Sequence, residues 1–160
     1  MKIELFHASE YGNGAMVAEE FRKIMASKGI AVNVQHVDDA NPKEIPSADL
    51  YIFSSPGRFG KPIKGMQKFL KKLQLPSGSR YALLATEMNP TANEKNTATP
   101  TNQELGKCQQ VIPIMNELLQ AKGLNKIAES KIFVVGLKGP LENDWQRKVG
   151  DFANIISGSQ

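Results

Sequence analysis

The sequence predicts a doubly wound α/β fold, in which five parallel strands in the order 2-1-3-4-5 carry helices on both faces of the sheet. Strand-like and helix-like segments alternate along the chain, and parallel strands need such crossover connections. Residues 50–53 form a short apolar run that is typical of central parallel strands. Glycine-containing loops follow the first and third strands, and this topology binds its ligands between those two strands.

The size and composition of the chain suit one globular domain spanning 1–160. No stretch reaches the roughly 18 consecutive apolar residues of a membrane span, and the first residues form a strand-like pattern rather than a signal peptide. We therefore expect a cytoplasmic protein without membrane contact. Cys108 is the single cysteine and excludes an internal disulfide. His7 and His36 lie far from it in the sequence, so we expect them to have structural roles and predict no metal site.

The individual elements follow from periodicity and from turn residues. A helix is predicted from Ala15 to a glycine cap at Gly29, and Pro113 is expected to kink the helix predicted at 103–122. The polar segment 87–102 is too long for an ordinary connection, which indicates a functional lid or a disordered loop. Strands are predicted at 2–7, 30–37, 50–53, 80–86 and 131–135, and further helices at 63–73 and 143–156.

The first candidate loop connects the first strand to a helix. Its backbone N–H groups and the positive end of the helix converge on one small volume, which is suited to a phosphate. Gly12 and Gly14 allow close approach of the backbone, and Ser9 and Asn13 offer side-chain donors. Taken alone, the pattern fits a plain structural turn about equally well. The loop comprises Ser9, Glu10, Tyr11, Gly12, Asn13 and Gly14.

Two further loops are expected at the same edge of the sheet, because they follow the third and fourth strands. The carboxyl ends of parallel strands meet at one edge, so all three loops should surround one site. The loop after the third strand comprises Ser55, Pro56, Gly57, Arg58, Phe59 and Gly60. The loop after the fourth strand comprises Thr86, Glu87, Met88 and Asn89.

In these loops the sequence resembles the flavodoxin family, whose first loop has the form S/T-x-T-G-N-T. Ser9, Gly12 and Asn13 match that form, whereas Tyr11 and Gly14 replace hydroxyl residues that touch the phosphate in the family. The resemblance implies a flavodoxin-like fold with flavin mononucleotide (FMN) bound at the strand ends. It also implies that main-chain donors compensate for the two replaced hydroxyls, or that FMN is held more loosely.

The loop that begins Ser55-Pro56-Gly57 corresponds to the S-P-T-x-x-G loop beside the isoalloxazine ring of flavodoxins. Its R-F-G variant is similar to flavodoxin-like NAD(P)H:quinone oxidoreductases. The resemblance implies that Gly57 or Gly60 turns a peptide carbonyl towards N5 of the reduced flavin. Phe59 is the nearest aromatic side chain for the flavin, although core packing under the loop is an alternative role. Met88 stands where many relatives place a covering aromatic.

Other folds with similar elements fit less well. A dinucleotide-binding fingerprint would need Gly or Ala at Val17, and it leaves the second glycine loop unexplained. A phosphorylation receiver domain would need acidic residues where the chain has Ala8 and Ser54. Within the flavin interpretation three functions remain open: an electron carrier, an FMN-dependent NAD(P)H:quinone reductase, and a binding module that has lost FMN.

The distribution of charge along the chain indicates what kind of binding partner to expect. The formal net charge is +4, no nucleic-acid partner is expected, and one stretch carries six cations without an acidic residue. This stretch is either a solvated helix face or a docking surface for an anion. The partner would then be an acidic redox protein or a small anionic or quinone acceptor. The six cations are Arg58, Lys61, Lys64, Lys68, Lys71 and Lys72.

These cations also predict a redox property. Each partly screened positive charge near the flavin should stabilise the anionic reduced form by about 1 kcal/mol. We therefore expect the hydroquinone couple to be less negative than in flavodoxins with acidic surroundings. A dithionite titration of the bound flavin measures this couple, and a strongly depressed potential would contradict the expectation.

Overall fold

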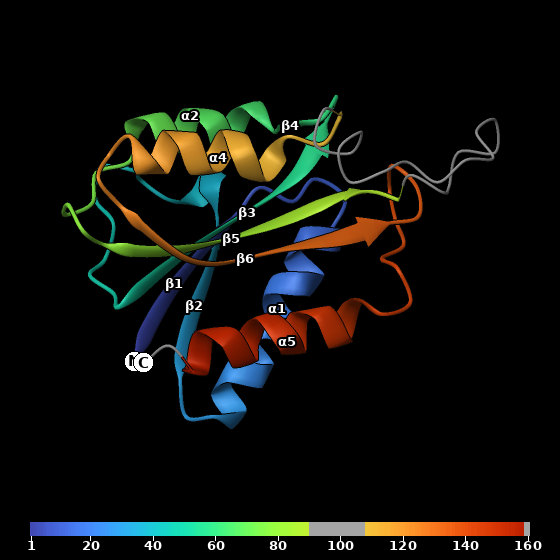
Figure 1. Ribbon diagram of the computed structural model, residues 1–160, viewed down its shortest axis with the longest axis horizontal. Helices are drawn as coiled ribbons and strands as arrows, with labels where there is room; N and C mark the ends of the chain where they lie inside the picture. The colour runs from blue at the N-terminus through green and yellow to red at the C-terminus, as the bar shows by residue number, and fades with distance from the viewer. Residues whose placement is uncertain (90–107, 159–160) are drawn as a thin grey trace.

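The computed structural model describes residues 1–89 and 108–158, and its centre is a parallel sheet (Figure 1). The strand order is β2-β1-β3-β5-β6, which is the predicted order 2-1-3-4-5 once only the parallel strands are counted. A short strand, β4, pairs antiparallel with the end of β3. The strands are β1 (Lys2–His7), β2 (Ala31–His36), β3 (Leu50–Arg58), β4 (Lys61–Pro62), β5 (Arg80–Met88) and β6 (Asn125–Val134).

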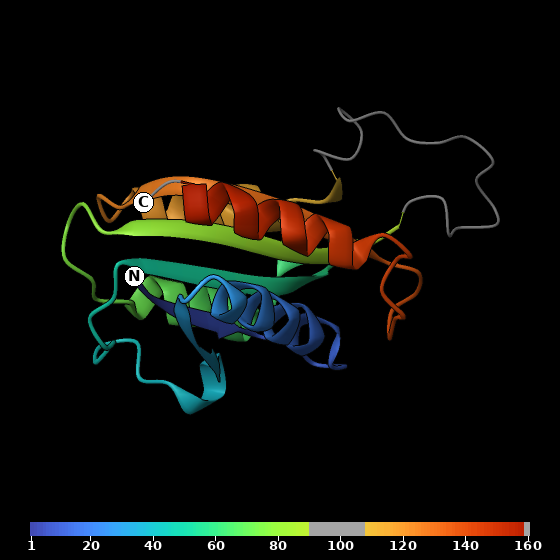
Figure 2. The same ribbon diagram turned by 90° about the horizontal axis from the view of Figure 1, so that it is seen from below.

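Helices cover both faces of the sheet, as the sequence predicts (Figures 1 and 2). Helices α1 (Asn13–Ser27) and α5 (Trp145–Gly158) pack side by side on one face. Helices α2 (Lys64–Lys72) and α4 (Val111–Gln120) cover the other face, and a short 3-10 turn, η1 (Val37–Asp39), contacts α2. The chain therefore forms three layers, with one apolar core on each side of the sheet.

The alternation of side chains along the strands supplies both cores. In β1, Ile3 and Leu5 belong to the core under α1 and α5, whereas Phe6 belongs to the core under α2 and α4. In β3 the run from Leu50 to Phe53 is buried throughout, because this strand has neighbours on both sides and helices on both faces. Among the described residues, no helix has the length and apolar character to cross a membrane.

Three strands are longer than the sequence indicated. β3 runs to Arg58 rather than ending at 53, because it pairs with β5 as far as Pro56 and then with β4. β5 extends to Met88, and β6 begins at Asn125, because the two strands pair along their whole length. Glu87 and Met88 therefore lie in a strand rather than in the expected loop at 87–102. The part of that loop from residue 90 onward lies outside the described residues.

Pro113 does not kink a helix, contrary to expectation. α4 begins at Val111, so Pro113 is its third residue. The backbone nitrogens of the first turn have no acceptor within the helix, and a proline is tolerated there. The part of the predicted helix from 103 to 107 lies outside the described residues.

A tight hairpin turn joins β3 to β4 at Phe59 and Gly60. Their φ angles of 53° and 78° are both positive, as a two-residue turn of type I′ requires. The carbonyl oxygen of Gly60 accepts the N–H of Gln110 at 2.6 Å. A Cβ atom at position 60 would lie 1.9 Å from the carbonyl oxygen of Cys108, so only glycine fits this turn.

We therefore predict different effects for two glycine substitutions. Gly78 also has a positive φ, of 86°, but open space surrounds its Cα atom. Gly78→Ala should destabilise the protein by about 1 to 2 kcal/mol, the cost of a left-handed conformation. Gly60→Ala should cost about 1 to 3 kcal/mol more because of the overlap with Cys108. Urea unfolding of both variants measures the difference, and equal losses would contradict the contact described here.

Candidate functional site

A cleft opens at the carboxyl ends of β1, β3, β5 and β6. The three segments predicted as loops all contribute to it, although 55–58 and 86–88 are the ends of β3 and β5. The end of β6 and the loop that follows β6 complete the lining. The lining residues are Ser9, Glu10, Tyr11, Asn13, Gly14, Pro56, Gly57, Arg58, Thr86, Met88, Val134 and Leu137.

The first loop presents the N-terminus of α1 to this cleft. Gly12 is the N-cap residue, with a φ of 93°, and neither a side-chain cap nor an acidic residue occupies the first turn. The N–H of Gly12 donates to Ser9 Oγ at 3.0 Å, which bends the loop back upon itself. A Cβ atom on Gly14 would lie 3.3 Å from Ser9 Cβ, so glycine allows this tight approach. An uncapped helix end of this kind suits an anion.

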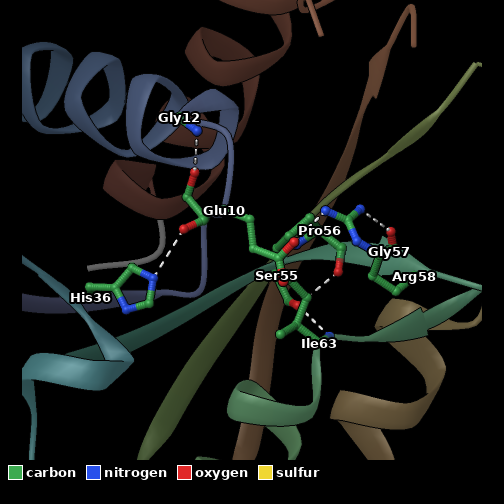
Figure 3. A network of polar contacts seen from close by, with 9 residues as sticks. Glu10, Gly12, His36, Ser55, Pro56, Gly57, Arg58 and Ile63 are labelled. Carbon is green, nitrogen blue, oxygen red and sulfur yellow. Dashed lines mark hydrogen bonds and ion pairs between the residues drawn. The ribbon is translucent and has the colours of Figure 1, made fainter. Parts of the chain in front are cut away.

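Two histidines hold the backbone of Ser9, and Figure 3 shows one of them, His36. His36 Nδ1 accepts the N–H of Asp38 at 3.0 Å, so its Nε2 carries the proton and donates to the Ser9 carbonyl at 3.0 Å. His7 Nδ1 accepts the Ser9 N–H at 3.3 Å. Burial lowers the pKa of His7, and the nearby His36 lowers it further, so His7 is kept in the neutral form that can accept. The structural roles expected for both histidines are thus roles in shaping the first loop.

An ion pair joins the first loop to the second. Arg58 Nη2 contacts Glu10 Oε2 at 2.5 Å, and Arg58 Nη1 donates to the Gly57 carbonyl at 3.1 Å (Figure 3). Glu10 therefore does not leave an uncompensated negative charge beside the N-terminus of α1. Ser55 lies below the cleft: it is fully buried, and its hydroxyl donates to the Pro56 carbonyl and accepts the N–H of Ile63.

Exposed apolar side chains gather around the cleft. Two cations lie near the ring of Tyr11, with Arg58 Cζ at 5.1 Å and Lys138 Nζ at 5.8 Å from its centroid. Met88 and Leu137 are about half exposed and line the cleft from β5 and from the loop after β6. Phe59 is fully exposed at the hairpin tip, which rules out the alternative that it packs in the core.

A second hollow adjoins the first on the far side of Gly57 and Arg58. Glu87 lies in its wall, and its carboxylate is almost completely buried beneath Gly57. The hollow shares Gly57, Arg58, Met88 and Leu137 with the cleft. Its full lining is Gly57, Arg58, Phe59, Gly60, Glu87, Met88, Cys108, Gln109 and Leu137.

Some residues differ from their predicted places. Gly12, Ser55 and Asn89 do not line either hollow: Gly12 caps α1, Ser55 is fully buried, and the N–H of Asn89 donates to the Val134 carbonyl at 2.8 Å. Val134 and Leu137 line the cleft but were not predicted from the sequence. A pattern in the sequence could have predicted them: the glycine-containing segment 136–140 follows the last parallel strand, so it must lie at the same edge of the sheet as the other predicted loops.

The residues present fit the FMN that the sequence resemblance implies. The uncapped end of α1 and the Ser9 hydroxyl can receive a phosphate, and the exposed side chains of Met88 and Leu137 can contact a flat apolar ring. Tyr11 and Gly14 stand where the family's first loop has hydroxyl residues, and they differ in what they offer a ligand. Tyr11 turns its ring towards two cations, and Gly14 leaves the N-terminus of α1 open to the cleft.

Solved structures share this fold. Oxidised Flavodoxin 2 from Bacillus cereus is 19% identical, with a TM-score of 0.76 and an alignment covering 100% of both chains. A Fusobacterium nucleatum flavodoxin bound to flavin mononucleotide is 14% identical, with a TM-score of 0.67, covering 99% of this chain and 98% of that one. Rubredoxin oxygen:oxidoreductase from Desulfovibrio gigas is 12% identical, with a TM-score of 0.71, and this chain spans only 35% of its length while 99% of this chain is covered.

The sequence itself carries the family signal. A search of curated proteins gave no match. The flavodoxin family model, however, matches residues 5–87, which is more than half of the chain. The match includes the end of β1, all of α1, β2, β3, β4 and α2, and nearly all of β5. This match contains the loop at the N-terminus of α1 and the hairpin after β3. The chain therefore belongs to the flavodoxin family, whose cofactor is FMN.

Proposed function

We propose that the chain is a cytoplasmic electron-transfer protein that binds FMN in the cleft and exchanges electrons with an acidic protein. One observation carries this proposal: the uncapped end of α1 opens into the same cleft as the exposed Met88 and Leu137. One end of the cleft thus suits a phosphate, and the other suits an aromatic ring. When bound, FMN supplies electron transfer in one-electron steps.

The residues around the cleft have separate tasks in this proposal. Ser9 and the first turn of α1 bind the phosphate, and the two histidines keep Ser9 in position. Gly57, Met88 and Leu137 border the ring. Arg58 and Lys138 add positive charge at the same place, and this charge favours a reduced flavin that is anionic.

A basic surface next to the cleft supports an acidic partner. It begins at β4, which pairs with Gly57 and Arg58, and it continues along the exposed side of α2. The lysines of this surface, Lys61, Lys64, Lys68, Lys71 and Lys72, form no ion pair within the described residues. Phe59, two residues before Lys61, adds a fully exposed ring that can serve as an apolar anchor for a partner. Such a surface steers an oppositely charged protein towards the flavin. We call it the α2 basic surface, and it comprises Lys61, Lys64, Lys68, Lys71 and Lys72.

The second hollow favours a second candidate function, the reduction of a small acceptor such as a quinone. Phe59, Met88 and Leu137 give it an apolar lining beside the cleft. An apolar hollow with few polar groups is a common form of small-molecule site. The segment 87–102, predicted from the sequence as a functional lid or a disordered loop, lies from residue 90 onward outside the described residues.

Absorption spectroscopy tests the proposal directly. The purified protein, incubated with FMN and freed of excess, should carry the absorbance bands of oxidised flavin. A colourless protein would instead favour a binding module that has lost FMN. If FMN is bound, NADPH oxidation with and without an added quinone separates the carrier from the reductase.

The phosphate end of the cleft gives a quantitative prediction. Ser9→Ala removes the acceptor for the Gly12 N–H and a donor for the phosphate. Losing about 1 kcal/mol of hydrogen bonding should weaken FMN binding about fivefold. Riboflavin lacks the phosphate, so its affinity should change much less. Fluorescence titration of both flavins measures this, and an equal loss for the two would contradict the assignment of Ser9.

The α2 basic surface gives a second prediction. With an acidic ferredoxin as the probe, the rate of electron transfer should fall as ionic strength rises, because opposite charges attract. The double variant Lys64→Glu with Lys68→Glu should lower the rate on the order of tenfold at low salt. Stopped-flow spectroscopy measures both effects.

The matched control places the same charge change on α1. Lys23 on α1 and Lys28 at its C-cap are exposed, and α1 lies on the opposite face of the sheet from α2 (Figure 1). Lys23→Glu with Lys28→Glu changes the net charge equally and should leave the rate near that of the wild type. If both double variants slow the reaction alike, the effect comes from net charge and the α2 basic surface is not the docking site.

A further inference from the structure

Glu87 is a buried acid directly beneath the loop that borders the flavin site. Its side chain is 2% exposed, although it lies near the carboxyl end of β5, where the strand approaches solvent. A Cβ atom on Gly57 would be 3.3 Å from Glu87 Cγ and 3.5 Å from Oε2, so the carboxylate packs against the Gly57 backbone. Glu87 also lines the hollow that adjoins the cleft. None of the tasks assigned so far uses this group.

One oxygen of this carboxylate has no hydrogen-bond partner. Among the described residues, Glu87 Oε1 is buried and accepts no hydrogen bond. Lys131 Nζ lies 3.7 Å away, beyond hydrogen-bond distance, and donates instead to Gln109 Oε1 at 2.9 Å. An unpartnered buried oxygen is costly for an ionised carboxylate, and a bound proton relieves part of that cost.

Three side chains that carry a charge or can titrate lie around Glu87. Lys131 faces it from β6, and Arg58, at the end of β3, and the Cys108 thiol, before α4, line the same hollow. Arg58 is already paired with Glu10. Burial raises the pKa of the Glu87 carboxyl, and Lys131 opposes part of this rise. Because burial and Lys131 act on Glu87 in opposite directions, a new negative charge at the flavin can change whether its carboxyl group is protonated.

We propose that Glu87 takes up a proton when the bound flavin receives its second electron and becomes anionic. This inference rests on the proposed function, because it requires FMN in the cleft. One electron enters the flavin from the external reductant, and one proton passes from water to the Glu87 carboxylate. The proton compensates for the added charge on the other side of the Gly57 peptide, and reoxidation releases it to water.

The sign of the pH dependence follows from this coupling. At pH values below the pKa that Glu87 has before the second electron is added, the proton is already bound and the second couple does not depend on this group. Between that pKa and the higher pKa that follows the second electron, reduction is accompanied by proton uptake, so the potential falls as the pH rises. Above the higher pKa Glu87 stays ionised and the slope disappears again. Within this window the equilibrium constant for reduction changes up to tenfold per pH unit, or about 59 mV for one electron.

The experiment compares the potential of the second couple across pH in three FMN-bound proteins. Glu87→Gln keeps the shape of the side chain but cannot titrate, and it should remove the slope that is due to this group. Any slope caused by N1 of the flavin itself remains in this variant. Glu129→Gln is the matched control, because Glu129 is a half-exposed acid on β6 that pairs with Lys126, and it should behave like the wild type.

A third variant tests the direction of the effect. Lys131→Gln removes the cation that opposes the rise of the Glu87 pKa, so the window of pH dependence should move to higher pH. A pH indicator dye in weakly buffered solution should report proton uptake with the second electron in the wild type. The uptake should be smaller in Glu87→Gln.

The outcomes separate this inference from the proposed function. A protein that binds no FMN overturns the proposed function and the inference with it. A protein that binds FMN but shows the same slope and the same proton uptake with and without Glu87 overturns the inference alone. Loss of the slope in Glu87→Gln, together with its shift in Lys131→Gln, supports the inference.

Discussion

β1 pairs in parallel with β2 on one side and with β3 on the other, and the registers bring His7 level with His36 and Ser54. Because the order of the strands reverses here, α1 and α2 lie on opposite faces of the sheet (Figure 1) and leave a crevice at the carboxyl ends of β1 and β3. The same registers place His36 beside Ser9. The open cleft and the shape of its first loop therefore both depend on how β1 is paired.

Among the described residues, every buried side-chain nitrogen or oxygen except Glu87 Oε1 has a hydrogen-bond partner. Ser9 is held by histidines from β1 and β2, and Ser55 joins the end of β3 to the start of α2. Such contacts keep the loops in place before any ligand arrives, which lowers the entropic cost of binding. The N-terminus of α1 is left without a side-chain cap, so its donors are available to an anion.

The sequence was sufficient for the strand order, the layers and the three loops, because these follow from periodicity and from the rule on carboxyl strand ends. It did not predict that β3 reaches Arg58, since Ser55-Pro56-Gly57 has the composition of a loop and becomes strand only by pairing with β4 and β5. The burial of Glu87 and the contacts of the two histidines depend on neighbours distant in sequence. Local sequence patterns do not predict such contacts.

The bond from the Gln110 N–H to the Gly60 carbonyl makes the hairpin tip part of a longer mechanical linkage. The adjacent Gln109 donates to the Met88 carbonyl at 2.8 Å and accepts from Lys131 at 2.9 Å. The hairpin, the end of β5 and the side chain of Lys131 are thus tied to the same two residues before α4. A displacement of the hairpin by a ligand or a docking protein would be transmitted to Met88, which lines the second hollow, and to Lys131 beside Glu87.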